Sequence, residues 1–187
     1  MKKFTLLFLA TILTFVVSSC SKKEDVAPVT IVGKWTANGI GAITDTKTYD
    51  VTVADIRKLD PKTADSLAII KVEYKADGTY LYNKDKGTYK VSADNKTLTL
   101  TSTIEKDSKG AFSVDIIDIP VLTASELKMG LKKLTKKATD KEYTVAFDES
   151  FISYLYAIIA INVKDQVNAD AIEAKSTSLQ GTLNFKR

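Results

Sequence analysis

The stretch Ile31-Val32-Gly33-Lys34-Trp35-Thr36-Ala37 decides how the rest of the chain is interpreted. Trp35 is the only tryptophan among 187 residues. An apolar pair, a glycine that admits a close neighbour and a large ring two residues later describe a first strand whose indole enters a core. The residues before this stretch have the pattern of an export signal, and those after it the pattern of a barrel.

The N-terminus reads as a secretory signal. Two lysines precede an apolar run of 14 residues, Phe4 to Val17, which ends in Ser18-Ser19-Cys20. A membrane-spanning helix needs about 20 apolar residues, so a cleaved signal is the better interpretation. Cys20 is the only cysteine in the chain, which excludes an intramolecular disulfide.

The residues around Cys20 resemble a bacterial lipobox, here Val17-Ser18-Ser19-Cys20. The resemblance implies diacylglycerol on the Cys20 sulfur, cleavage before Cys20 and acylation of the new amine, for example with palmitate. Two or more lipid chains hold a protein stably on a membrane. We therefore expect a signal peptide over 1–19 and a lipidated tether over 20–30, with an ordinary cleavage site and a free thiol as the alternative.

The tether also carries a charged patch, Lys23-Glu24-Asp25. This patch resembles the surface-export signal of Bacteroidota lipoproteins, which implies an outer-membrane protein exposed on the cell surface. A solvated linker on a periplasm-facing lipoprotein is the alternative. Membrane attachment through Cys20 does not depend on this choice.

Residues 31–187 predict one all-β domain. Short segments with a period of two alternate with turns about every 8 to 12 residues, which favours a sandwich or a barrel. Asp77-Gly78 predicts a two-residue hairpin turn, and Asn83 to Lys86 a polar turn. Strands are expected over 48–53 and 97–101 and, through Tyr143, Val145 and Phe147, late in the chain.

Three features resemble the lipocalin-like domains of bacterial lipoproteins: Gly33-Lys34-Trp35, the Asp77-Gly78 hairpin with its flanking strands, and Leu122-Thr123 to Leu127. The resemblance implies an antiparallel up-and-down barrel. It also implies a basic side chain, Lys186 or Arg187, lying across the ring of Trp35. The Thr-Asp-Tyr motif of the larger lipocalins is absent, so the resemblance is to the shorter bacterial proteins.

Closure of the barrel is a specific expectation, because a terminal strand paired with the first removes both exposed edges. We expect residues 31–37 to pair with residues 181–185. Asn38-Gly39-Ile40-Gly41 predicts a bend after the first strand. The insertion from Asp55 to Leu67, with helical turns starting at Asp60-Pro61, would form a lid over the barrel mouth or cover a sheet edge.

The C-terminal third departs from a simple barrel. Phe151 to Val163 is largely apolar and predicts a helical segment packed against the barrel, although its β-branched and aromatic content leaves a long strand as the alternative. Residues 165–175 predict a second helical piece. The basic cluster at Lys132, Lys133, Lys136 and Lys137 contains no aromatic residue and favours a solvated face over a nucleic-acid site.

Composition narrows the chemistry. The chain has no histidine, which excludes histidine-based catalysis and histidine-ligated metal sites. Asp115 and Asp118 are an odd number of positions apart and should face opposite sides of a strand, and Asp148-Glu149 suits a helix cap. We therefore expect no catalytic residues, metal or cofactor, a monomer, and no nucleic-acid partner. An enzyme that uses carboxylates from separate strands is the third alternative, and it predicts clustered carboxylates in a cleft.

Aromatic residues are the candidate ligand-binding groups. Tyr74, Tyr80, Tyr82 and Tyr89 lie on neighbouring predicted strands and, with Trp35, would line an apolar cavity inside the barrel. The resemblance implies non-catalytic binding of a small apolar ligand there. The alternative is a barrel packed solid with side chains, whose loops bind a protein or glycan partner.

Overall fold

The computed structural model describes residues 29–106, 109–137 and 149–187. Cys20, the signal peptide and the strand expected around Tyr143 to Phe147 lie outside the described residues. The elements in chain order are β1 (Gly33–Thr44), β2 (Thr48–Thr52), α1 (Val53–Leu59), α2 (Pro61–Ala68), β3 (Lys71–Tyr74), β4 (Thr79–Tyr82), β5 (Asp85–Val91), β6 (Thr97–Lys106), β7 (Phe112–Leu122), β8 (Glu126–Thr135), α3 (Glu149–Val163), α4 (Gln166–Lys175) and β9 (Ser178–Lys186).

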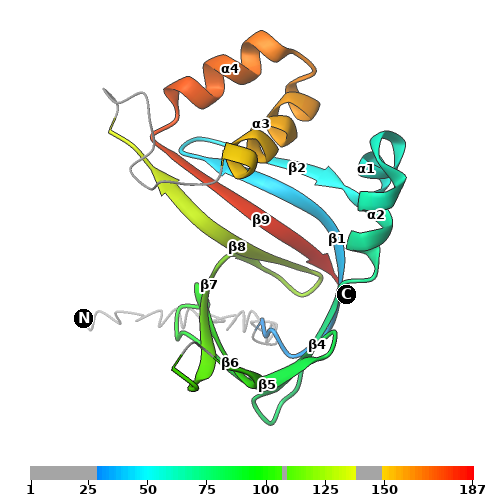
Figure 1. Cartoon of the computed structure of the whole chain (residues 1–187), viewed down its shortest axis with the longest axis vertical. Helices are drawn as coiled ribbons and strands as arrows, with labels where there is room; N and C mark the ends of the chain where they lie inside the picture. The colour runs from blue at the N-terminus through cyan, green and yellow to red at the C-terminus, as the bar shows by residue number, and fades with distance from the viewer. Residues whose placement is uncertain (1–28, 107–108, 138–148) are drawn as a thin grey trace, which may run out of the picture.

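Eight of these strands close an antiparallel barrel (Figure 1). Their order is β1-β3-β4-β5-β6-β7-β8-β9, and β9 pairs back onto β1. Apart from β2, each strand therefore lies beside its neighbour in the sequence, as in an up-and-down barrel. β2 pairs with β1 alone and lies outside the ring. The expected fold class, an all-β lipocalin-like barrel with a C-terminal helical segment, is confirmed.

The first and last strands pair, as closure requires, but of the expected residues 31–37 only Thr36 and Ala37 take part, because Gly33 to Thr36 pair with β3. The ladder runs from Thr36 opposite Lys186 to Thr44 opposite Leu179, with a bulge between Ala37 and Gly39. The bend expected at residues 38–41 is wrong, because β1 continues through it. A Cβ on Gly41 would lie 2.5 Å from Thr182 Oγ1, so this glycine permits tight packing across strands and does not turn the chain.

Two hydrophobic cores share the long strands β1 and β9. One fills the closed end of the barrel with Ile31, Trp35, Leu98, Leu127 and Phe185. The other, the helical core, lies between the helices and those halves of the same strands that are farther from the closed end. Its buried residues include Ile40, Val51, Leu134, Leu155, Ile158 and Leu179. Leu183 packs against both cores.

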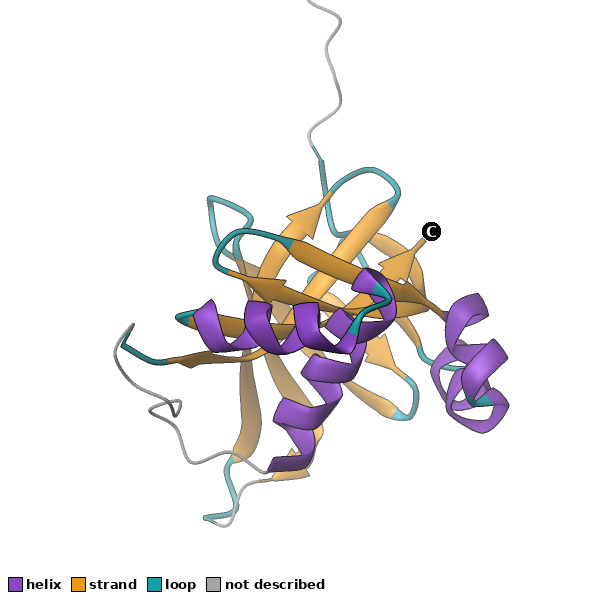
Figure 2. Ribbon diagram, turned by 90° about the horizontal axis from the view of Figure 1, so that it is seen from above, coloured by secondary structure: helices purple, strands orange, loops and turns teal. Residues whose placement is uncertain are grey.

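The helices cover one side of the strand layer. Figure 2, seen from above, shows α3 and α4 lying across the strands in a V, with α1 and α2 beside them. The expected helix over 151–163 is confirmed as α3, and the second helical piece as α4, which Asp165 caps by accepting hydrogen bonds from the main-chain N–H groups of Val167 and Asn168. Within the described residues, no helix combines the length and the apolar character that crossing a bilayer requires.

The insertion between β2 and β3 holds two helices, of which the sequence predicted one. Asp60 caps α2 as expected, whereas α1 starts directly after β2, where Thr52 Oγ1 accepts a hydrogen bond from Asp55 N. Ile56 and Ala64 are buried in the helical core. The insertion therefore packs beside β1 and β2.

Lys136 departs from the expectation of a solvated basic face. Its side chain is buried, and its Nζ donates to the carbonyl oxygens of Glu173 and Ala174 at 3.4 and 3.2 Å. These carbonyls end α4, where a cation is favourable. The described residues of both cores lie between Ile31 and Phe185, so a chain that starts at residue 26 contains all of them.

Candidate binding cavity in the barrel

A cavity of about 280 Å³ remains inside the barrel above the closed end. Its volume lies just below the range of about 300 to 1,000 Å³ that is common for small-molecule sites. Residues from seven barrel strands or their ends line it: Val72, Tyr74, Tyr80, Tyr82, Asp85, Leu100, Glu105, Asp115, Ile117, Met129, Gly130, Leu131 and Leu183. The barrel interior is therefore only partly filled by its own side chains.

Strand alternation places three of the four candidate tyrosines in this lining. Tyr80 lies opposite Tyr74 on β3 and opposite Gly87 on β5, so all three positions face inward. A Cβ on Gly87 would lie 2.9 Å from a ring carbon of Tyr80. The missing side chain at Gly87 thus leaves room for the Tyr80 ring. Tyr82 follows two residues later on the same face.

The fourth tyrosine, Tyr89, supports the lining from behind. Its ring packs edge-on against Tyr74, with 5.0 Å between centroids, and its hydroxyl donates to the carbonyl of Lys75 at 2.8 Å. The rings of Tyr74 and Tyr80 also pack together, with 6.5 Å between their centroids. Burial, with the neighbouring tyrosines, raises the pKa of Tyr74 well above its usual range, so this ring stays neutral. These contacts fix the aromatic wall of the cavity.

Asp85 is held rigidly at the mouth. Its carboxylate accepts hydrogen bonds from the Tyr80 hydroxyl at 2.6 Å, from Ser102 Oγ at 2.7 Å and from Lys86 N at 2.8 Å. Burial raises the pKa of Asp85, but the three hydrogen bonds outweigh it, and the net shift is downward. Asp85 therefore stays ionised at neutral pH in a fixed orientation.

Two further carboxylates, Glu105 and Asp115, complete an acidic mouth. Burial is the main cause that raises the pKa of Tyr80, and the charges of Asp85, Asp115 and Glu105 add to it, so all three acids lie near one hydroxyl. Asp118 is on the opposite face of β7, where it accepts a hydrogen bond from Gln180. The expected separation of Asp115 and Asp118 is confirmed.

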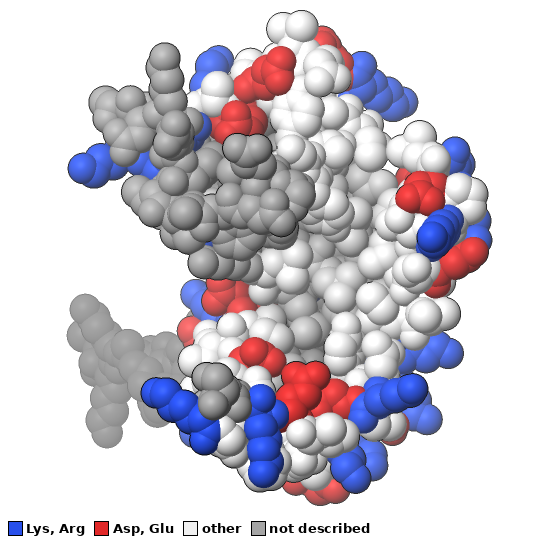
Figure 3. All heavy atoms as spheres, in the orientation of Figure 1, with Lys and Arg blue, Asp and Glu red and all other residues white. Residues whose placement is uncertain are grey.

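The mouth opens where β7 and β8 separate. The two strands pair only between Asp118 and Leu122 on β7 and between Leu127 and Gly130 on β8. Among the residues that the structure describes, the remaining parts of β7 and β8 pair with β6 and β9 respectively. Figure 3 shows the hollow between the two halves of the molecule, with acidic atoms along its lower rim.

The opposite end of the barrel is closed around Trp35. Its indole Nε1 donates to the carbonyl of Ile31 at 2.7 Å, and the Arg187 guanidinium lies over the ring, with Cζ 4.5 Å from the centroid. The expected basic residue is therefore Arg187. Trp35 is buried in the core and, like Tyr89, does not line the cavity, whereas Tyr74, Tyr80 and Tyr82 do.

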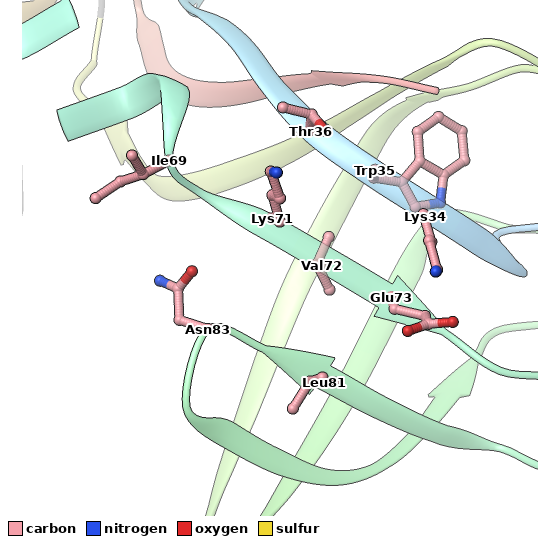
Figure 4. A pocket seen from close by; sticks show the side chains of 9 residues that line it. All are labelled: Lys34, Trp35, Thr36, Ile69, Lys71, Val72, Glu73, Leu81 and Asn83. Carbon is pink, nitrogen blue, oxygen red and sulfur yellow. The ribbon is translucent and has the colours of Figure 1, made fainter. Parts of the chain in front are cut away.

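A second hollow lies on the outer face of β1, β3 and β4. Figure 4 shows the side chains around it, among them Lys34, Lys71, Glu73 and Leu81. It holds about 480 Å³, is more open than the barrel cavity and is lined by solvated charges of both signs. No group of three or more potential metal ligands is found in the part of the chain that the structure describes.

None of the three acids at the mouth was among the predicted binding residues, and Asp115 was considered only for its position relative to Asp118. Asp85 was expected in a polar turn, yet Asp85, Gly87 and Tyr89 share the inward face of β5, and their period of two is visible in the sequence. Glu105 lies beyond the strand expected over 97–101, because β6 extends to Lys106. No residue pattern near Glu105 indicates this extension.

Comparison with known proteins gives no family for this barrel. No protein-family model matches the chain, and no curated protein matches its sequence. The structure shows an eight-stranded antiparallel barrel that is closed at one end by Trp35 and Arg187 and is consistent with a lipocalin-like fold.

Proposed function

We propose that this protein binds a small, mostly apolar molecule in the barrel without chemical conversion, and that it does so as a lipoprotein anchored to the bacterial outer membrane. The observation that carries the binding proposal is the cavity of about 280 Å³, walled by tyrosines and aliphatic side chains. Apolar walls with a few placed polar groups are typical of ligand sites. The anchor rests on the sequence around Cys20 alone.

Native mass spectrometry tests the binding proposal. Residues 26–187, purified from the natural host, should carry a small molecule that is released on unfolding. Leu131→Trp places a large ring at the cavity mouth and should lower occupancy severalfold. Leu81→Trp, on the outer face, is the matched control, because Leu131 and Leu81 are similarly exposed, at 41% and 43%. Equal occupancy in both variants would contradict binding inside the barrel.

The anchor has its own test. Metabolic labelling with a fatty acid should mark the full chain and fail to mark a Cys20→Ala variant. Protease treatment of intact cells then separates the surface from the periplasmic face. Labelling that persists in Cys20→Ala would refute this attachment site.

A second candidate is a surface that binds a protein or glycan partner. Phe112, Val114 and Ile116 on β7 are 48%, 56% and 74% exposed, which is unusual for large apolar residues in a row on one strand face. Cross-linking on intact cells should capture a partner that an Ile116→Asp variant loses. If Ile116→Asp leaves the cross-linked products unchanged, this candidate fails.

A further inference from the structure

We propose that the ligand of the barrel cavity is cationic, a small primary amine or quaternary ammonium compound with a short apolar body. The inference rests on the proposed function and specifies the chemistry of its ligand. Two features of the cavity carry it: the sign of the charges among its described lining residues and the tyrosines that line it with them.

The charged residues that the structure describes in the cavity lining all have one sign. Of the thirteen described residues that line the cavity, three are acids, and no lysine or arginine is among them. These acids give the described lining a negative charge, although the whole sequence has a formal net charge of +4. A cation entering the mouth is attracted, whereas a fatty acid carboxylate is repelled.

The walls beneath the acids suit a cation as well. The rings of Tyr74, Tyr80 and Tyr82 contribute to the lining, and aromatic faces attract ammonium groups, quaternary ones included. Asp85 is already fixed by Tyr80, Ser102 and the main chain, so binding does not have to order its carboxylate. The aliphatic part of the ligand would rest on Leu100, Met129 and Leu183.

Three probes of equal chain length test the proposal by calorimetry on residues 26–187. They are hexyltrimethylammonium, hexanol and hexanoate. We expect the ammonium probe to bind about tenfold more tightly than the alcohol, and the carboxylate most weakly. Glu105→Gln and Asp115→Asn should each weaken the ammonium probe about two- to fivefold and leave the alcohol unchanged. Raised salt should reduce the preference.

Glu73→Gln is the matched control for Glu105→Gln. It removes the same charge from the outer face of β3, outside the cavity, and should change no affinity. If alcohol and carboxylate bind as well as the ammonium probe, the inference falls and the apolar-ligand proposal stands. Failure of all three probes to bind would overturn both. An equal effect of Glu73→Gln and Glu105→Gln would show that only the overall charge matters and would refute the mouth as the site.

Discussion

Replacement of Arg187 by alanine tests how the closed end of the barrel is held. The guanidinium lies over the Trp35 ring, with Cζ 4.5 Å from its centroid, and Nη2 donates to the carbonyls of Thr30 and Val32 at 2.7 and 2.8 Å. A cation–π contact at an exposed site contributes about 1 kcal/mol. Two charge-assisted hydrogen bonds near the surface add about 0.5 to 1 kcal/mol each.

The expected loss for Arg187→Ala is therefore about 2 to 3 kcal/mol in the free energy of unfolding. For a domain of this size it corresponds to a fall of about 5 to 10 °C in Tm. Urea unfolding followed by fluorescence measures it directly, because Trp35 is the only tryptophan and reports on this end of the barrel. The m-value should not change.

Two further variants isolate the cause. Arg187→Lys keeps the charge but loses the planar fork, and should lose about half as much stability. Lys186→Ala removes a neighbouring exposed cation and should stay within about 0.5 kcal/mol of the native protein. If Arg187→Ala costs no more than Lys186→Ala, the guanidinium does not hold the end of the barrel.

Three other predictions concern stability. Leu183→Ala should cost about 2 kcal/mol in chemical unfolding, since Leu183 packs on both cores, and a loss under 0.5 kcal/mol would contradict that position. Asp45→Ala should cost about 0.5 kcal/mol, because hydrogen bonds from Ser178 and Thr177 lower the pKa of Asp45, while solvent screening at this exposed site reduces their effect; this stability exists above the unfolded pKa, so the gap should close as thermal scans move below about pH 4, and a gap that persists at pH 2 would contradict it. Lys128→Met removes the partner of Asp50 from a 2.7 Å ion pair whose lysine is 7% exposed, and should cost about 1 to 2 kcal/mol in urea unfolding; an unchanged midpoint would show that the pair is not stabilising.

Local patterns predicted the fold where the structure obeys local rules. A period of two marked most of the strands, Asp60-Pro61 marked the start of α2, and the apolar run from Phe151 marked α3. These signals depend on neighbours in the sequence. The pairing of the last strand with the first followed because a barrel must remove its edges.

Non-local packing explains the errors. Gly39 and Gly41 have the composition of a bend, but their lack of side chains admits β2 and Thr182, which lie far along the chain. The start of α1 at Val53 was hidden because this residue also continues the alternation of β2. Trp35 was grouped with the tyrosines as a ligand contact, yet Ile31 and Arg187 hold it at the other end of the barrel.

The sharing of β1 and β9 by both cores makes the molecule a single cooperative unit. One half of each strand belongs to the core at the closed end of the barrel, and the other half lies beneath the helices. Melting either core alone would leave half of each strand without its packing, so partial unfolding gains little chain entropy for the contacts it loses. A ligand that stabilises the barrel therefore also protects the helices, which it does not touch.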